Sequence, residues 1–264
     1  MTSAFPTPAP APVPSTDVDL SGRTALVTGG GSGIGKACAL ALAAAHATVH
    51  VVDKDGESAK AVAGETGGQA HVIDLADPAA IGALPAEVDI LVNNAGFQHV
   101  APLTEFPPER FALMQQVMVT APFLLLRHTL PHMYANGWGR VINISSVHGL
   151  RASAYKSAYV AAKHALEGLS KVTAIEGAQH GVTSNCVNPG YVRTPLVERQ
   201  ISDQAAAHGI DAADVLADVL LTRSPIKRLL EPEEVAAAAL WLCSPHTAYI
   251  NGASVPLDGG WGAC

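Results

Sequence analysis

The sequence is poor in charge: Asp, Glu, Lys and Arg make up 15% of its 264 residues, whereas about a quarter of an average soluble domain is charged. No dense basic run is present, and 16 Lys and Arg stand against 23 Asp and Glu, so a nucleic-acid partner is excluded. Hydrophobic residues make up 48%. That share implies a large core together with contacts between subunits, and the length fits one domain.

Long hydrophobic runs are also absent. The best two, residues 37–45 and 235–243, have nine residues each, against the roughly 18 that a membrane-spanning helix needs. We therefore expect a soluble protein with no membrane partner. The four cysteines form no CxxC pair, so neither a metal site nor a disulfide framework is expected, and reduced thiols favour the cytoplasm.

The first 22 residues lack the basic start and the apolar stretch of a signal peptide, because proline recurs at positions 6, 8, 10, 12 and 14. A segment so rich in proline is typical of an extended, disordered chain. We expect such a tail over residues 1–19 and a single domain over residues 20–264.

From residue 23 onward, short apolar stretches alternate with segments rich in Ala and Leu. This alternation is typical of an α/β fold, a doubly wound parallel sheet covered by helices on both faces. The expected strands are residues 23–28, 47–53, 69–74, 88–94, 139–145 and 182–188. The expected helices are residues 33–45, 57–66, 109–134, 156–180 and 231–243. Residues 196–224 carry several charges and are expected to form a small helical lid.

A glycine-rich turn lies between the first strand and the first helix. The segment LVTGGGSGIGKA places Gly29, Gly33 and Gly35 there. Glycines at such a turn let backbone N–H groups and the helix N-terminus approach a pyrophosphate. A glycine-rich loop alone is a weak signal, but the strand before it and the helix after it favour a dinucleotide site.

Acidic and amide side chains follow the next strands. Asp53 ends the second strand, 18 residues beyond Gly35, where a carboxylate accepts hydrogen bonds from an adenosine ribose and repels a 2′-phosphate. NAD is therefore favoured over NADP. The neighbouring Lys54 points the other way, because a cation there suits a phosphate, but we interpret it as a solvated surface residue. Asp74 and the NNAG sequence at residues 93–96 close the third and fourth strands.

Ser146, Tyr159 and Lys163 form the strongest chemical signal. Tyr159 and Lys163 are four residues apart on an expected helix, so they project from one face. A free tyrosine titrates near pH ~10, and an adjacent ammonium lowers that pKa by stabilising the phenolate. We expect Tyr159 to act as a general base and Ser146 to bind the reacting oxygen. A Tyr and a Lys at this spacing often lie on an ordinary amphipathic surface, but the glycine turn upstream argues against that alternative.

The motifs TGGGSGIG, NNAG, YVAAK and NPGYVRT, with Ser146, resemble the short-chain dehydrogenase/reductase family over about residues 20–264. The resemblance implies a single Rossmann domain with a seven-stranded sheet, and a serine 13 residues before the tyrosine, which selects Ser146 over Ser145. It also implies that Lys163 binds the nicotinamide ribose and Thr194 the carboxamide. The expected cofactor-binding residues are Gly29, Ser32, Gly33, Ile34, Gly35, Asp53, Asp74, Leu75, Asn94, Ala95, Gly96, Tyr159, Lys163, Pro189, Gly190, Val192 and Thr194.

A narrower likeness within this family, to the bacterial D-3-hydroxybutyrate dehydrogenases, rests on NNAGFQHVAPLTEFP, SSVHGLRASAYKSAYVAAKHAL, PGYVRTPLVERQI and DGGWGA. It implies that Gln98, His148, Lys156 and Gln200 hold the substrate carboxylate and that Trp261 walls the pocket. Lys156 is expected in the first turn of its helix, where the macrodipole disfavours a cation by a few tenths to about 1 kcal/mol, so an anionic ligand would relieve this placement. Taken alone, Lys156 is better explained as a solvated loop residue, and Trp261 as a subunit contact.

One position departs from the family pattern. Where the family has an asparagine in its long helix, this chain has VMVTAPF at residues 117–123, which places Met118 there. A thioether cannot hold a relay water as an amide does, so the departure concerns how the proton leaves the site. Pro122 is expected to kink the helix, because it lacks a backbone donor. A buried core residue is the simple alternative for Met118.

The resemblance implies NAD-dependent, reversible oxidation of (R)-3-hydroxybutyrate to acetoacetate, and a homotetramer, as is frequent in the family. One alternative is another reductase of the family, acting on 3-oxoacyl thioesters or cyclic alcohols. A second alternative, suggested by Met118, is a catalytically impaired nucleotide-binding protein that works through partner contacts. The intact Ser146, Tyr159 and Lys163 argue against it.

Overall fold

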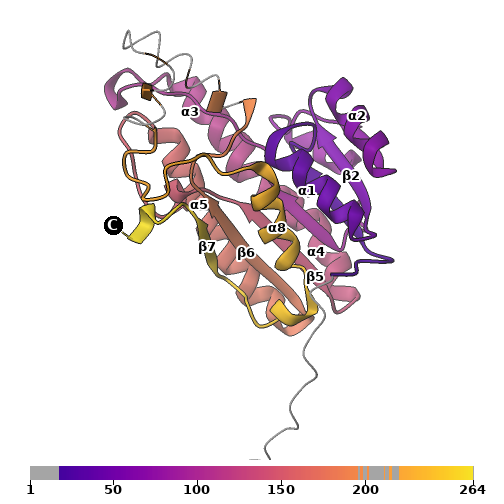
Figure 1. The fold of residues 1–264 in the computed structure, drawn as a ribbon. Helices are drawn as coiled ribbons and strands as arrows, with labels where there is room; N and C mark the ends of the chain where they lie inside the picture. Colours follow the sequence, from indigo (N-terminus) through magenta and orange to yellow (C-terminus); the bar gives the residue numbers. More distant parts are fainter. Residues whose placement is uncertain are drawn as a thin grey trace, which may run out of the picture.

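The computed structural model describes residues 18–195, 197–198, 201, 211, 214–215 and 220–263. Its centre is a parallel sheet of seven strands in the order β3-β2-β1-β4-β5-β6-β7 (Figure 1). The strands are β1 Thr24–Thr28, β2 Thr48–Asp53, β3 Gln69–Val72, β4 Ile90–Asn93, β5 Gly139–Ile144, β6 Val182–Pro189 and β7 Ser254–Leu257. This confirms the expected α/β Rossmann fold and all six strands located from the sequence, and it adds the seventh.

Helices cover both faces of the sheet, as expected for a doubly wound fold (Figure 1). They are α1 Gly33–Ala44, α2 Gly56–Thr66, α3 Pro108–Gln115, α4 Ala121–Ala135, α5 Ser157–Gly177 and α8 Pro232–Trp241. Side chains of a strand alternate between the faces, so Val27 packs in the core beneath α1 and α8 while the neighbouring Leu26 packs in the core beneath α4. Burial on both faces explains why the central strands β1 and β4 are mostly apolar.

The expected helix over residues 109–134 is interrupted. The turn Gln116–Thr120 between α3 and α4 is a π-helix, in which the Ala121 amide donates to the Gln116 carbonyl five residues back. Pro122 follows at the start of α4 and has no N–H to give the Met118 carbonyl. A π-turn accommodates such a missing bond within a helix. The expected disturbance at Pro122 is therefore present, and it takes the form of a wide turn that contains Met118.

Two expectations fall mainly outside the described residues. The tail expected over residues 1–19 lies there except for Val18 and Asp19, and so does most of the lid expected over residues 196–224. In the described part of that segment, Val197, Val215 and Leu220 belong to one small apolar cluster. None of the described helices is long and apolar enough to cross a membrane.

Two histidines meet across the edge of the sheet. His50 on β2 and His71 on β3 approach to 2.8 Å between Nδ1 and Nε2, so one ring donates and the other accepts while both stay neutral. Burial lowers the pKa of both side chains from the usual 6.5, and for His50 the neighbouring His71 lowers it further. The folded protein therefore resists protonation at this pair.

The pair predicts that stability falls as the pH falls from about 7.5 to about 5.5. Each histidine has a lowered pKa in the folded state, so the unfolded chain takes up more protons once the pH drops below the unfolded pKa of ~6.5. Urea unfolding at the two pH values measures the fall in free energy. The free energy of unfolding of His71→Gln should fall less between the two pH values than that of the parent. The control variant His246→Gln, at an exposed position, should show the same fall as the parent. Equal falls in all three proteins would contradict the role of the pair.

Candidate active site

A long cleft runs along the carboxyl ends of the strands. It has a volume of about 560 Å³, and it lies where open α/β sheets bind ligands. Of the residues expected to bind the cofactor, the structure brings all but one to its walls. Those in the cleft are Gly29, Ser32, Gly33, Ile34, Asp53, Asp74, Leu75, Asn94, Ala95, Gly96, Tyr159, Lys163, Pro189, Gly190, Val192 and Thr194.

Gly35 is the exception, because it is buried beneath the turn and does not line the cleft. A Cβ on Gly35 would collide with the Gly29 carbonyl and the Asn94 amide, so this glycine lets α1 approach β1. Gly29 has a φ of +61°, a conformation that glycine adopts without strain. The turn is thus shaped to expose backbone N–H groups and the start of α1 to an anion.

A threonine holds the floor of the cleft. The Thr28 hydroxyl, at the end of β1, donates to the Val92 carbonyl and accepts from the Asn94 and Ala95 amides at 2.9 and 3.1 Å. The Asn94 side chain donates back to the Thr28 and Gly29 carbonyls. These bonds tie the NNAG segment to the glycine turn, so both walls of the cleft move together.

Asp53 presents its carboxylate to the same cleft from the end of β2. One oxygen accepts from the Gly31 amide and the other from the Asp55 amide, each at 3.0 Å. These donors fix the orientation of the carboxylate and leave each oxygen with a further lone pair. Lys54 lines the cleft beside Asp53 with an exposed side chain, so both residues that bear on the choice between NAD and NADP lie at the expected place.

Ser146, Tyr159 and Lys163 meet where the cleft deepens. Tyr159 and Lys163 project from α5, and Ser146 follows β5. The Lys163 ammonium donates to the Ile144 carbonyl at 2.7 Å and lies 5.5 Å from the centre of the Tyr159 ring. The structure therefore assembles the three residues that the sequence pattern singles out.

The expected effect of Lys163 on Tyr159 is not found. Burial raises the pKa of Tyr159 to about 12, and a hydrogen bond from Ser146 only partly opposes it. Burial also lowers the pKa of Lys163 to about 8, against the opposing charges of Cys186 and Glu167. The low dielectric thus disfavours the phenolate and the ammonium alike, so the expectation that Lys163 lowers the Tyr159 pKa toward working pH is wrong for this geometry.

A buried carboxylate supports the serine. Glu167, one turn beyond Lys163 on α5, accepts from the Asn188 amide and from the Ser254 hydroxyl, both at 2.6 Å. The Asn188 amide also donates to the Ser146 carbonyl at 3.0 Å. Sequence reasoning missed Glu167. It lies four residues after Lys163 on the same helix face, a spacing that is equally common on exposed helix surfaces, so no local signal marks it as buried.

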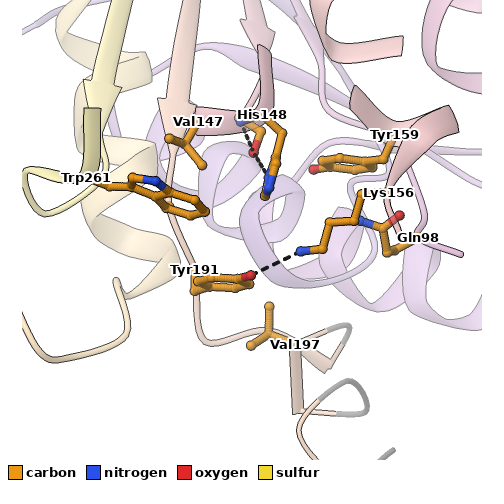
Figure 2. A pocket seen from close by; sticks show the side chains of 10 residues that line it. Gln98, Val147, His148, Lys156, Tyr159, Tyr191, Val197 and Trp261 are labelled. Atoms are coloured by element: carbon orange, nitrogen blue, oxygen red, sulfur yellow. Dashed lines mark hydrogen bonds between the residues drawn. The ribbon is translucent and has the colours of Figure 1, made fainter. Parts of the chain in front are cut away.

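A smaller pocket of about 60 Å³ opens beside the three residues (Figure 2). It contains four of the five residues expected to bind substrate, namely Gln98, His148, Lys156 and Trp261. The fifth, Gln200, lies outside the described residues. Tyr191, Val147 and Val197 line the pocket as well and were not expected, although the aromatic in NPGYVRT was a signal for Tyr191.

Lys156 differs from both interpretations of the sequence. It precedes α5 as the N-cap residue, so it does not lie in the first turn, and it is 7% exposed, so it is no solvated loop residue. Its ammonium donates to the Tyr191 hydroxyl at 3.1 Å and lies 5.0 Å over that ring (Figure 2). Tyr191 in turn stacks on Trp261. A buried cation thus points into the pocket from an aromatic wall.

His148 supplies the neutral polar wall. Its Nε2 lies 3.0 Å from the Ser153 hydroxyl, and its Nδ1 lies 3.4 Å from the Ser146 hydroxyl. Burial lowers the pKa of His148 to about 3, and the nearby Lys156 and Arg223 add to the effect. At neutral pH this side chain therefore acts as an uncharged hydrogen-bonding group.

Met118 is a core residue. It is 1% exposed and packs with Met114, Ala158 and Ala162, with Tyr159 at the edge of the cluster. A Cβ on Gly96 would lie only 3.0 Å from the Met118 sulfur, so the thioether fills the space beneath the cofactor cleft. The departure from the family asparagine is thus absorbed by packing in the π-turn.

Comparisons with known proteins agree with this geometry. Residues 29–262 match the model of a family described as enoyl-(acyl carrier protein) reductase. The chain belongs to the short-chain dehydrogenase/reductase family. It is therefore an oxidoreductase, and the family binds a nicotinamide dinucleotide.

Among its relatives in this family is the D-beta-hydroxybutyrate dehydrogenase of Rhizobium meliloti, 46% identical over 200 residues, which are 73% of this chain and 78% of the relative. The enzyme of that name from Cupriavidus necator is 47% identical over 173 residues, 66% of this chain and 67% of the relative. The L-sorbose reductase of Gluconobacter frateurii, complexed with NADPH and L-sorbose, has a TM-score of 0.85 and 30% identity, covering 93% of this chain and 98% of that chain.

Glu167→Gln tests the buried support of this dehydrogenase. A glutamine keeps one carbonyl for the Asn188 amide, but it turns the Ser254 hydroxyl from donor to acceptor and removes the charge that strengthens both hydrogen bonds. We expect a loss of roughly 1–3 kcal/mol in the free energy of unfolding, together with a lower kcat. The exposed Glu176→Gln on the same helix should change neither. If urea unfolding gave the same free energy of unfolding for both variants, the hydrogen bonds of Glu167 would not stabilise the fold.

Proposed function

We propose that this dehydrogenase oxidises (R)-3-hydroxybutyrate to acetoacetate, reversibly, with NAD as the acceptor. The observation that carries the proposal is the buried ammonium of Lys156 in a small pocket beside Ser146 and Tyr159. Lys156 is in no ion pair with a carboxylate of the described residues. A buried charge is costly unless it is paired, so a short anionic substrate would complete this site.

The pocket has room and polarity for such a substrate. A carboxylate beside Lys156 would share the pocket with the polar side chains of Gln98 and the neutral His148. The hydroxyl on the third carbon would then face Ser146 and Tyr159, which line the same pocket. Two relatives that carry the name D-beta-hydroxybutyrate dehydrogenase support this choice.

The cleft fits NAD, which supplies the hydride acceptor when it is bound. The glycine turn, whose Gly29 and Gly35 leave no room for side chains, would hold the pyrophosphate. Asp53 would accept hydrogen bonds from the adenosine ribose, Lys163 would bind the nicotinamide ribose, and Thr194 would bind the carboxamide. The exposed Lys54 and the NADPH of the sorbose reductase favour NADP, whereas the oriented carboxylate of Asp53 favours NAD.

Tyr159 moves the proton in this scheme. Its hydroxyl stays protonated at neutral pH because its pKa is raised to about 12 by burial, so it is ready to donate a proton to the carbonyl oxygen of acetoacetate. In the oxidative direction Tyr159 must first release its own proton to solvent and then accept the hydroxyl proton as the phenolate, while the hydride passes to NAD. A rising pH increases the fraction of phenolate and so favours this direction. Ser146 holds the reacting oxygen beside it in both directions.

We propose self-association as well, on the grounds of exposed apolar side chains. Val172 and Ile175 on α5, Trp241 on α8 and the neighbouring Tyr249 are between 47% and 102% exposed. A contiguous exposed apolar patch marks a contact with another chain, and packing these four side chains against a second copy would remove them from water. Copies that bury these helix faces would form the homotetramer that the family resemblance implies.

Lys156→Met tests the carboxylate assignment. The variant keeps the length and apolar stem of the side chain but removes the charge. We expect the KM for 3-hydroxybutyrate to rise by roughly 10- to 150-fold, because a charge-assisted hydrogen bond contributes about 1.5–3 kcal/mol. The KM for the methyl ester should change little, and Lys171→Met, at an exposed site on α5, should alter neither. Equal losses for acid and ester would refute the assignment.

Asp53→Ala tests the cofactor assignment. Removing the carboxylate removes both the ribose acceptor and the repulsion of a 2′-phosphate, so NAD should bind more weakly and the preference for NAD over NADP should narrow. Lys54→Ala, beside it on the cleft, should leave the NAD affinity unchanged. Steady-state kinetics with both cofactors provides the measurement, and an unaltered preference in Asp53→Ala would exclude a role in reading the ribose.

A further inference from the structure

A second cavity, of about 490 Å³, opens beside the substrate pocket. Trp261 lines both spaces. The two residues before it, Gly259 and Gly260, have φ values of +64° and +89° and form the turn that leads to the tryptophan. We call the second space the outer cavity. Its charged lining residues are Arg151, Arg223 and Lys227.

These three cations have no acidic partner among the described residues. Arg151 donates to the Leu150 and Gly262 carbonyls, and Lys227 donates to the Leu221 and Thr222 carbonyls. Arg223 lies 5.9 Å over the Trp261 ring. Backbone carbonyls position the side chains of Arg151 and Lys227, but a neutral carbonyl does not cancel a positive charge.

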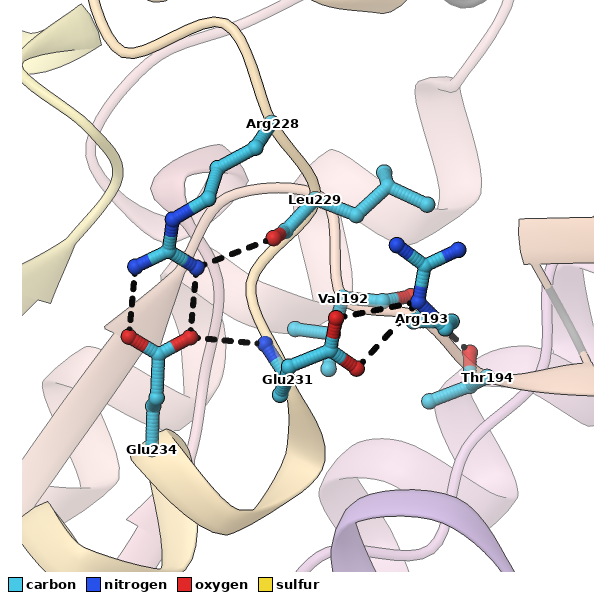
Figure 3. A network of polar contacts seen from close by, with 7 residues as sticks. All are labelled: Val192, Arg193, Thr194, Arg228, Leu229, Glu231 and Glu234. Atoms are coloured by element: carbon cyan, nitrogen blue, oxygen red, sulfur yellow. Dashed lines mark hydrogen bonds and ion pairs between the residues drawn. The ribbon is translucent and has the colours of Figure 1, made fainter.

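Other arginines of the same region are neutralised. Arg228 makes two hydrogen bonds to Glu234, at 2.6 and 2.7 Å, and Arg193 pairs with Glu231 at 3.0 Å (Figure 3). The Asp258 carboxylate, near the outer cavity, accepts from the Gly260 and Gly262 amides. In a chain whose net charge is −7, three cations in one cavity, with no carboxylate among the described residues that line it, require an explanation.

The positive field of this cavity extends through Trp261. Arg223 is among the charges that lower the pKa of His148 in the substrate pocket, so its influence crosses the ring that separates the two spaces. The rings of His148 and Trp261 are nearly perpendicular, with their centroids 5.4 Å apart. An anion bound at Arg223 would therefore weaken the positive potential that the substrate pocket experiences.

We propose that the outer cavity is a second anion-binding site, built for the phosphate group of a small molecule. Two guanidinium groups offer paired donors that match phosphate oxygens, and the ammonium of Lys227 adds a point charge. Three positive charges are balanced better by a phosphate monoester, which carries −1.5 to −2 at neutral pH by the usual phosphate pKa of ~6, than by one carboxylate. Trp261 adds an apolar wall for the rest of the ligand.

The site is coupled to catalysis through Trp261 and Arg223. Phosphate in the outer cavity should raise the KM for an anionic substrate and leave kcat unchanged, because it cancels part of the field that attracts the substrate. This coupling rests on the proposed hydroxy-acid function, whereas the anion site itself does not.

Calorimetric titration with inorganic phosphate tests the site on the enzyme saturated with NADH, so that the dinucleotide cleft is filled. The parent should bind phosphate, and Arg223→Gln and Arg151→Gln should each bind it at least about tenfold more weakly. Arg228→Gln, whose guanidinium is paired with Glu234 outside the cavity, should bind as the parent does. Circular dichroism checks that the exposed substitutions leave the fold intact.

Three results would overturn the proposal: no phosphate binding by the parent, unchanged binding in Arg223→Gln and Arg151→Gln, or acetate binding as tightly as phosphate at the same ionic strength. The proposed function fails in a different way. If phosphate binds and no 3-hydroxy acid is turned over, the anion site stands and the substrate assignment falls.

Discussion

Helix α5 buries a lysine and a glutamate one turn apart, and the catalytic site depends on how the strand ends hold them. Lys163 donates to the end of β5, and Glu167 accepts from Asn188 of β6 and Ser254 of β7. Charges of this kind are expensive to bury unless each is paired or hydrogen-bonded. The contacts therefore fix α5 against three strands at once, and with it the direction in which Tyr159 points.

The two ends of the site carry side chains of opposite charge. The adenosine end of the cleft carries the oriented carboxylate of Asp53, and the substrate end carries the buried ammonium of Lys156. Between them His148 stays neutral and Tyr159 stays protonated, because burial shifts both pKa values away from neutrality. The substrate pocket thus combines the buried ammonium of Lys156 with the uncharged side chains of His148 and Tyr159.

The long helix shows how the fold absorbs a departure from the family pattern. Pro122 removes a helical bond, the π-turn widens to accommodate it, and Met118 in that turn packs into the core under the cleft. The side chain that replaces the family asparagine therefore contributes volume and contact with Tyr159. Its effect on the site comes through packing, which is what a flexible thioether does well.

The sequence by itself determined the alternation of strands and helices, the glycine turn, the Tyr159 and Lys163 pair and the positions of six strands, because these depend on periodicity and on spacing along the chain. It did not reveal β7, whose four residues include Pro256, a residue that only an edge strand tolerates. Tertiary structure alone decided the contact of Lys156 with Tyr191, the support of Ser146 by Glu167 and the raised pKa of Tyr159. Each of these depends on burial and on residues tens of positions apart, which a local pattern does not encode.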